Sequence, residues 1–163
     1  MSMKIHSRPA NGETNEWLTP PGLLAKLGDF DLDPCAHPDQ FYQTASRMVC
    51  PPQDGLSEAW SGRVWLNPPY GQQLKKWIAR IADHGNGIAL VPSRTEVESW
   101  FWPYVWEAAD AVMFLRGRLY FHRPDGSTAG NAGHGSVLAA YGQANVDTLY
   151  KSGIVGRVVN RLA

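Results

Sequence analysis

The apolar residues of this chain fall into short uninterrupted runs and into sets with helical spacing. An uninterrupted apolar run between turn residues is typical of a strand buried on both faces of a sheet. Such runs predict strands over residues 64–66, 87–92, 111–115 and 136–141. Residues 30–33 alternate apolar and acidic side chains before a proline, which predicts a first strand that ends at Asp33. Residues 154–159 predict a last strand at the edge of the sheet.

Two sets of apolar residues recur at helical spacing, namely Leu23, Leu24 and Leu27, and Leu74, Trp77, Ile78 and Ile81. Thr19 is the expected N-cap of the first helix, which prolines begin and Gly28 ends. Residues 98–109, rich in aromatic side chains that we expect to cover the sheet, and residues 146–150 predict two more helices. The alternation of strands and helices predicts a three-layer α/β fold with a mostly parallel sheet and a late antiparallel strand pair.

The polar segments divide the chain into an arm and one domain. Residues 1–15 mix Ser, Pro, Gly, Asn and charged residues without periodicity, which predicts a flexible arm. Residues 16–163 are short enough to form a single domain. Residues 122–135 are rich in Gly, Asn, His and Ser and predict a long flexible loop, placed to clamp a substrate. The 17 residues between Ala36 and Asp54 leave little room for a helix and a second strand.

Composition excludes several classes of protein. Hydrophobic residues make up 44% and charged residues 18% of the 163 residues, which is ordinary for a soluble globular domain. No apolar run is long enough to span a membrane and the first 15 residues are polar, so we expect a cytoplasmic protein. Two cysteines are too few for a disulfide scaffold and lack the partners of a zinc site.

The charge is unevenly distributed although the net charge is zero. A net charge of zero argues against binding to nucleic acid, which normally requires an excess of Lys and Arg. Residues 1–60, however, hold four basic and eight acidic side chains, whereas residues 111–163 hold six basic and two acidic ones. An acidic half suits a positively charged ligand, and a basic half suits phosphates.

The residues Asn67, Pro68, Pro69 and Tyr70 directly follow the strand predicted over residues 64–66. The Asn67 side-chain oxygen and the Pro68 carbonyl can each accept one hydrogen from the same amino group, and Tyr70 offers a flat face for the ring that carries it. Two such bonds draw the nitrogen toward tetrahedral geometry and free its lone pair for attack. The tetrapeptide alone is equally compatible with a proline pair that only ends a strand.

Several further motifs accompany this tetrapeptide: Glu16-Trp17-Leu18-Thr19-Pro20, Asp31-Leu32-Asp33-Pro34-Cys35-Ala36, Asp54-Gly55-Leu56 with Trp60, Pro92-Ser93-Arg94-Thr95, and Gly117-Arg118-Leu119. In this order and spacing, residues 13–142 resemble the compact phage-type DNA N6-adenine methyltransferases, the Dam-like family. The resemblance implies a Rossmann-like methyltransferase fold, S-adenosylmethionine as cofactor and DNA as partner. It implies site-specific methylation of the N6 amino group of adenine, in the cytoplasm of a bacterial host cell.

The resemblance and the positions of the motifs assign candidate site residues. The catalytic residues are Asn67, Pro68 and Tyr70. The cofactor-binding residues are Trp17, Thr19, Pro20, Asp33, Pro34, Cys35, Asp54 and Leu56, with Asp33 near the methionine ammonium. The substrate-binding residues are Pro69, Arg94, Arg118 and His122, and no metal is expected.

Three of these assignments have plain structural alternatives. Trp17 also suits packing before a capped helix, and Asp54 also suits an ordinary turn. Arg94 is also placed to pair with Glu96 or Glu98. The chain also departs from many methyltransferases because no Gly-x-Gly follows Asp33.

Two other functions fit the same motifs. Asn-Pro-Pro-Tyr also serves enzymes that methylate RNA bases or the side-chain amide of glutamine, so the substrate class stays open. A nucleic-acid-binding relative without catalytic activity would explain the missing glycines and the lack of an identifiable acid for the cofactor ribose.

Overall fold

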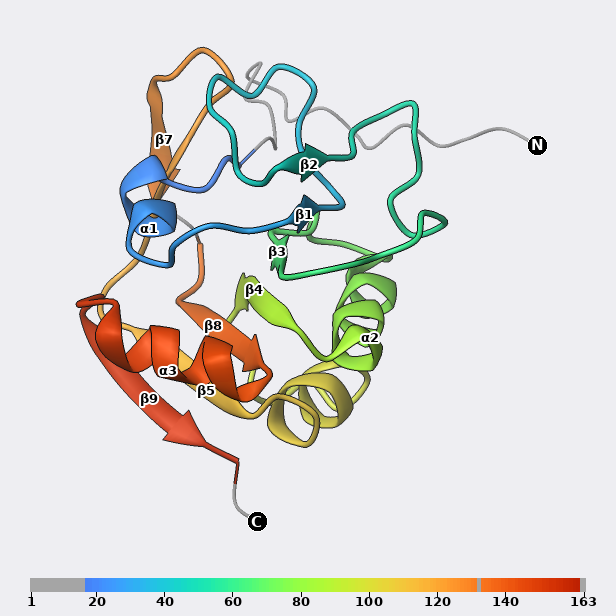
Figure 1. Ribbon diagram of the computed structural model, residues 1–163. Helices are drawn as coiled ribbons and strands as arrows, with labels where there is room; N and C mark the ends of the chain where they lie inside the picture. Colours follow the sequence, from blue (N-terminus) through green and yellow to red (C-terminus); the bar gives the residue numbers. More distant parts are fainter. Residues whose placement is uncertain (1–16, 132, 162–163) are drawn as a thin grey trace.

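The computed structural model describes residues 17–131 and 133–161, so the predicted arm over residues 1–15 lies outside the described residues. The described residues form one seven-stranded sheet with the order β2-β1-β3-β4-β8-β5-β9 (Figure 1). Its strands are β1 (Leu32–Asp33), β2 (Arg47–Met48), β3 (Val64–Leu66), β4 (Gly87–Pro92), β5 (Ala111–Leu115), β8 (Ser136–Tyr141) and β9 (Gly156–Asn160). The predicted strands at β1, β3, β4, β5, β8 and β9 are confirmed.

The sheet is mixed, and its parallel part is formed by the first four strands of the chain. Strands β2, β1, β3 and β4 pair in parallel, β8 lies antiparallel between β4 and β5, and β9 lies antiparallel to β5 at the edge. The late antiparallel pair predicted from residues 111–115 and 136–141 is therefore confirmed as β5 and β8. The described segments thus include five strands that run in one direction and two that run in the other.

Helices cover both faces of the sheet, which gives the three predicted layers. Figure 1 shows α2 (Leu74–His84) and the helical turn η1 (Trp102–Trp106) on one side, and α1 (Pro21–Ala25) and α3 (Gln143–Lys151) on the other. Side chains alternate along each strand. Val64 and Leu66 of β3 therefore pack in the cluster that contains α2, while Trp65 packs in the cluster that contains α1 and α3.

The apolar face predicted for α2 is confirmed, because Leu74, Trp77, Ile78 and Ile81 are all buried. The helix predicted over residues 98–109 is shorter and differs in type. Its regular part is the π-helical turn η1, in which the Glu107 N–H donates to the Trp102 carbonyl at 3.0 Å. Pro103 lies in this turn and has no N–H to donate, which disfavours an ordinary α-helical turn here.

The N-cap predicted at Thr19 is wrong. Helix α1 begins at Pro21, as the prolines predict, but its N-cap residue is Pro20 and no side chain caps it. The Thr19 hydroxyl instead accepts a hydrogen bond from the Asn67 side chain, 48 positions later in the chain. The Thr19 hydroxyl, which the local sequence predicts to cap the helix, is thus used in a tertiary contact.

A second strand does form between Ala36 and Asp54, contrary to the estimate that little room remains for it. Strand β2 pairs in parallel with β1 through Leu32 opposite Arg47 and Asp33 opposite Met48. The connection between them, residues 34–46, contains no helix. Leaving out the crossover helix is what allows a parallel strand to fit in so short a segment.

The segment predicted as a flexible loop is in part a hairpin. Strands β6 (Tyr120–His122) and β7 (Thr128–Asn131) pair antiparallel and form a small second sheet. Leu18 extends this sheet, since its backbone exchanges two hydrogen bonds with His122. The hairpin is thus attached to the segment that precedes α1. None of the helices in the described part of the chain is long and apolar enough to cross a membrane.

Arg63 joins three parts of the fold at the amino end of β3. Its guanidinium donates to the carbonyls of Leu27 at 2.9 Å and Asp29 at 2.8 Å and to the Asn145 side chain at 2.7 Å. It also lies over the Phe30 ring, 4.2 Å from the centroid. The residue therefore ties β3 to the segment after α1 and to α3.

We expect Arg63→Ala to lower the free energy of unfolding by about 3 kcal/mol, because two carbonyls and one amide lose a charged donor. The matched control is Arg94→Ala, since Arg94 makes an exposed ion pair with Glu96 and pairs of this kind contribute about 0–1 kcal/mol. Urea unfolding of both variants measures the difference. Equal destabilisation by the two substitutions would contradict this role of Arg63.

Candidate active site

The chain reverses its direction of travel across the sheet at β1, which has β2 on one side and β3 on the other. In open α/β sheets, ligands bind at the carboxyl ends of the strands beside such a reversal. Asp33 ends β1 and Asn67 directly follows β3, so both lie at this position. The Cys35 thiol donates to the Asn67 carbonyl at 3.3 Å and links the two strand ends.

The Asn67 side chain has a defined orientation. Its amide nitrogen donates one hydrogen to the Trp17 carbonyl at 3.0 Å and the other to the Thr19 hydroxyl at 3.1 Å. Within the described ranges, no residue donates to the Asn67 Oδ1 atom or to the Pro68 carbonyl. The tetrapeptide therefore presents two unused acceptors, and the Tyr70 side chain beside them is 37% exposed.

Asp33 is a buried carboxylate, only 3% exposed. It accepts hydrogen bonds from the Thr44 hydroxyl at 2.5 Å and from the Cys35 N–H at 3.1 Å. Burial raises its pKa to about 6, although these two hydrogen bonds act in the opposite direction. No Lys or Arg among residues 17–131 and 133–161 forms an ion pair with it. A buried carboxylate without a cation is suited to bind a cationic ligand group.

The loop over residues 54–57 packs against the strand end at Asp33. Gly55 is buried, and a Cβ atom added to it would lie 1.7 Å from the Pro34 carbonyl oxygen. The Asp54 carboxylate accepts from the Leu56 N–H at 3.1 Å and from the Ser57 hydroxyl at 2.7 Å. The bond from Ser57, followed by that from Leu56, lowers the pKa of Asp54. Both carboxylate oxygens of Asp54 are thus used within its own turn.

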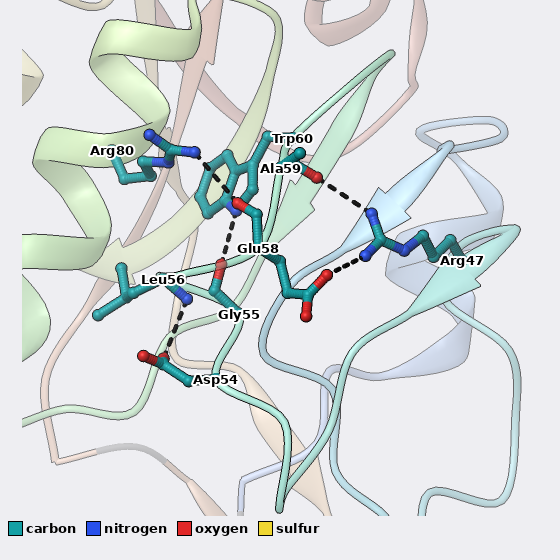
Figure 2. Close-up of polar contacts among 8 residues, drawn as sticks. All are labelled: Arg47, Asp54, Gly55, Leu56, Glu58, Ala59, Trp60 and Arg80. Carbon is teal, nitrogen blue, oxygen red and sulfur yellow. Dashed lines mark hydrogen bonds and ion pairs between the residues drawn. The ribbon is translucent and has the colours of Figure 1, made fainter.

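Trp60 is hydrogen-bonded to this loop, as Figure 2 shows. Its indole N–H donates to the Gly55 carbonyl at 2.8 Å, and its ring stacks on Trp77 with the Arg80 guanidinium 5.4 Å from its centroid. On the other side, Arg47 donates to the Ala59 carbonyl at 3.0 Å and pairs with Glu58 (Figure 2). The loop is therefore held from both α2 and β2.

We expect Gly55→Ala to lower the free energy of unfolding by at least about 2 kcal/mol, because the added methyl group collides with backbone and not with a movable side chain. Gly22→Ala is the matched control. Gly22 lies in α1 with no atom near the position of its missing Cβ, so the same change is expected to be neutral or stabilising by about 0.5–1 kcal/mol. Thermal unfolding compares the two, and a stable Gly55→Ala variant would contradict the packing of this loop.

The predicted cofactor-binding residues lie around the two strand ends. Trp17 and Thr19 contact Asn67, and Pro20 follows them as the N-cap residue of α1. Pro34 is buried under Gly55, and Cys35 and Leu56 are partly buried against the same core cluster. Residues of the motifs at 17–20 and 33–35 thus contact Asn67, and the motif at 54–56 packs on Pro34.

The predicted substrate-binding residues are more dispersed. Pro69 and Arg118 are exposed, and Arg94 donates to the Glu96 carboxylate at 2.7 Å, which is one of the two pairings expected if its role is structural. His122 belongs to β6, and its ring lies 6.1 Å from the ring of Phe41. Pro69 lies in the Asn67 turn itself, and His122 is connected to the site through its pairing with Leu18.

Sequence reasoning missed two residues that bind the site from the 34–46 connection. Tyr42 donates its hydroxyl hydrogen to the Thr19 carbonyl, and Thr44 donates to Asp33. Nothing local distinguishes them, because neither belongs to a periodic run or to a motif. Their only signal is their position in a loop that directly follows the predicted end of a strand at Asp33.

Fold and site together define an α/β protein in which a buried carboxylate at the end of β1 and an acceptor-rich Asn-Pro-Pro-Tyr turn after β3 lie at the same edge of the sheet. Such a turn is suited to bind an amino group, which is what an amino-methyltransferase requires. The sequence model of one family, DNA N-6-adenine-methyltransferase (Dam), matches residues 6–151, and the chain belongs to this family. No curated protein and no solved structure matches the chain.

Proposed function

We propose that the protein transfers a methyl group from S-adenosylmethionine to the N6 amino group of adenine in DNA, on a Rossmann-like methyltransferase fold. The observation that carries the proposal is the orientation of Asn67. Both of its amide hydrogens are used by Trp17 and Thr19, so its oxygen is left to accept a hydrogen from an amine. Membership of the Dam family supports DNA adenine as the acceptor.

The protein acts chiefly by positioning. A target base that has left the duplex stacks on the exposed Tyr70 ring, and its amino group donates one hydrogen to Asn67 Oδ1 and one to the Pro68 carbonyl. These bonds draw the nitrogen toward tetrahedral geometry and free its lone pair for direct attack on the methyl carbon that the cofactor would supply. The alkylated nitrogen is acidic and releases its proton to water, so no strong base is needed. Acceptors fixed in advance lower the barrier because they need not reorganise during the reaction.

The residues around Asp33 fit the cofactor. Its carboxylate is buried, has no cationic partner among the described residues and has a raised pKa, which suits the ammonium of a bound methionine moiety. When bound, S-adenosylmethionine supplies an electrophilic methyl group on its sulfonium. Asp33 would hold the ammonium, and Trp17, Thr19, Pro20, Pro34, Cys35, Asp54 and Leu56 stay predicted cofactor contacts.

DNA is the proposed partner. The basic last third of the chain, residues 111–163, contains the exposed Arg118 and the β6–β7 hairpin. The hairpin is attached to the site through Leu18 and His122, so a phosphate backbone bound there lies near the Asn67 turn. Arg118, His122, Arg94 and Pro69 stay the predicted substrate contacts, and recognition of a specific site is expected to come from this region.

The decisive experiment incubates the purified protein with methyl-labelled S-adenosylmethionine and unmethylated DNA, and detects N6-methyladenine in the digested DNA by mass spectrometry. RNA and a glutamine-containing protein substrate are tested in parallel. Label that appears in N6-methyladenine of DNA supports the proposal. Label only in RNA or protein overturns the substrate, and failure to bind the cofactor overturns the enzymatic function and favours a nucleic-acid-binding relative.

A further inference from the structure

The side-chain amide of Asn67 can in principle face its neighbours in two ways. The oxygen and nitrogen of a carboxamide have nearly the same size, so a half turn exchanges an acceptor for two donors without a change in shape. The proposed chemistry works in only one orientation, since a donor that faced the amino group would repel it. Something in the fold must therefore select the orientation.

The segment over residues 17–19 supplies that selection. Leu18 donates to the His122 carbonyl at 2.9 Å and accepts from the His122 N–H at 3.0 Å, so both of its backbone groups face β6. In extended chain, successive carbonyls point to opposite sides. The Trp17 and Thr19 carbonyls accordingly point away from β6, where the first accepts from Asn67 and the second accepts from the Tyr42 hydroxyl.

Thr19 is held rigidly in this arrangement. Its side chain is 2% exposed, and its carbonyl is bound by Tyr42. Burial, followed by the nearby charge of Asp33, raises the pKa of Tyr42 above its ordinary value, so its hydroxyl keeps its hydrogen at neutral pH. The Trp17 ring packs edge-on against Phe121, with centroids 5.6 Å apart. The two atoms that face the Asn67 amide nitrogen therefore have fixed positions.

We propose that Thr19 is a positioning residue for catalysis, whose hydroxyl oxygen holds the Asn67 amide in the orientation that the Trp17 carbonyl selects, so that Oδ1 faces the methyl acceptor. This inference rests on the proposed function and assigns to Thr19 a role different from the expected cofactor contact. A turned amide would place its oxygen against the Trp17 carbonyl oxygen, which can only accept, and would keep at most one hydrogen bond, donated by the Thr19 hydroxyl, in place of the two that the nitrogen now donates.

The test is Thr19→Val, which keeps the shape of the side chain and removes the acceptor. We expect kcat to fall about 10- to 100-fold while the Kd for S-adenosylmethionine stays within about twofold. Thr19→Ser keeps the hydroxyl and is expected to restore kcat to within about threefold of wild type. Thr44→Val is the matched control, since Thr44 is also buried but donates to Asp33, and its effect is expected on the Kd for the cofactor.

A readout that needs no methyl transfer is the exchange of the Asn67 side-chain amide hydrogens with water, followed by nitrogen-15 NMR and assigned by loss of the signal in Asn67→Ala. Both hydrogens are expected to be protected in wild type, and in Thr19→Val one is expected to exchange at least about tenfold faster. Tyr42→Phe is a second variant, which removes the hydrogen bond to the Thr19 carbonyl and keeps the Thr19 hydroxyl. It is expected to change amide exchange and kcat in the same direction as Thr19→Val, by a smaller factor.

Unchanged amide exchange in both variants, or an effect of Thr19→Val that falls on the cofactor Kd as in Thr44→Val, would overturn the inference. If wild type transfers no methyl group to DNA, the proposed function fails while the exchange experiment still decides the orientation of Asn67. If wild type is active and Thr19→Val loses protection without a decrease in kcat, the positioning role fails and the proposed function stands.

Discussion

Replacing Asn67 by Ala is expected to lower methyl transfer at least about 1,000-fold, because the substitution removes an acceptor that acts on the reacting nitrogen itself. The Kd for S-adenosylmethionine is expected to stay within about threefold of wild type, since Asp33 and its partners Thr44 and Cys35 are unchanged. Steady-state transfer to unmethylated DNA and titration calorimetry measure the two quantities.

Asn67 also donates to Trp17 and Thr19, so folding of the variant is checked by its thermal unfolding. Asn160→Ala is the matched control, because Asn160 is an exposed asparagine on β9, at the opposite edge of the sheet from β2. It is expected to retain wild-type transfer. Near-normal activity of a folded Asn67→Ala variant would contradict the proposed mechanism.

Asp33→Asn is expected to weaken cofactor binding about 100-fold without loss of stability in the free protein at pH 7. The first effect follows from removing the only charge proposed to face the ammonium, since a buried charged pair contributes about 3 kcal/mol when one partner is removed. The second follows from the pKa of Asp33, which burial raises from 3.8 to about 6. At pH 7 the folded state therefore carries a desolvated charge that the asparagine lacks.

The raised pKa of Asp33 also defines how the stability of the protein depends on pH. Between pH 4 and pH 6 the folded wild type binds a proton at Asp33 that the unfolded chain has released, so this group makes the protein less stable as the pH rises through that window. Asp33→Asn is therefore expected to gain stability relative to wild type, on the order of 1–3 kcal/mol, from pH 4 to pH 7. Urea unfolding of both proteins at several pH values measures the difference and cancels the contribution of the other carboxylates.

Cofactor affinity is expected to have the opposite dependence on pH. A cation binds the charged form of Asp33, so the Kd of wild type should increase about tenfold for each pH unit below 6 and stay level above it. In Asp33→Asn this dependence should be absent. Equal cofactor affinity of the two proteins at pH 7 would contradict the role of Asp33 as the ammonium ligand.

The elements that local periodicity defines were predicted well. The buried face of α2 and the strands β3, β4, β5 and β8 each contain enough apolar residues in sequence to reveal their period. Strand β2 and the β6–β7 hairpin were missed for a common reason. Each strand is short, and what stabilises it is pairing with a distant or facing segment, which leaves no periodic signal in its own residues.

The candidate site likewise contains residues that the sequence predicts and residues that it does not. The motif that holds Asn67 and the strand end at Asp33 were recognised because each is a contiguous string with its own chemistry. Tyr42 and Thr44 were missed, and Thr19 was taken for a helix cap, because their roles depend on hydrogen bonds to residues between 11 and 48 positions away.

The sequence alone determined the order of the strands and helices that have internal periodicity, the resemblance to the Dam-like enzymes and the identity of the groups that would act on an amine. These properties are local, since a covalent string carries them wherever it lies in the fold. The tertiary structure decided which way the Asn67 amide points, what surrounds the Asp33 carboxylate and how the 54–57 loop meets Pro34. Orientation and burial depend on atoms that folding brings from elsewhere in the chain. The motif therefore identifies the reacting group, but only the tertiary structure determines its orientation.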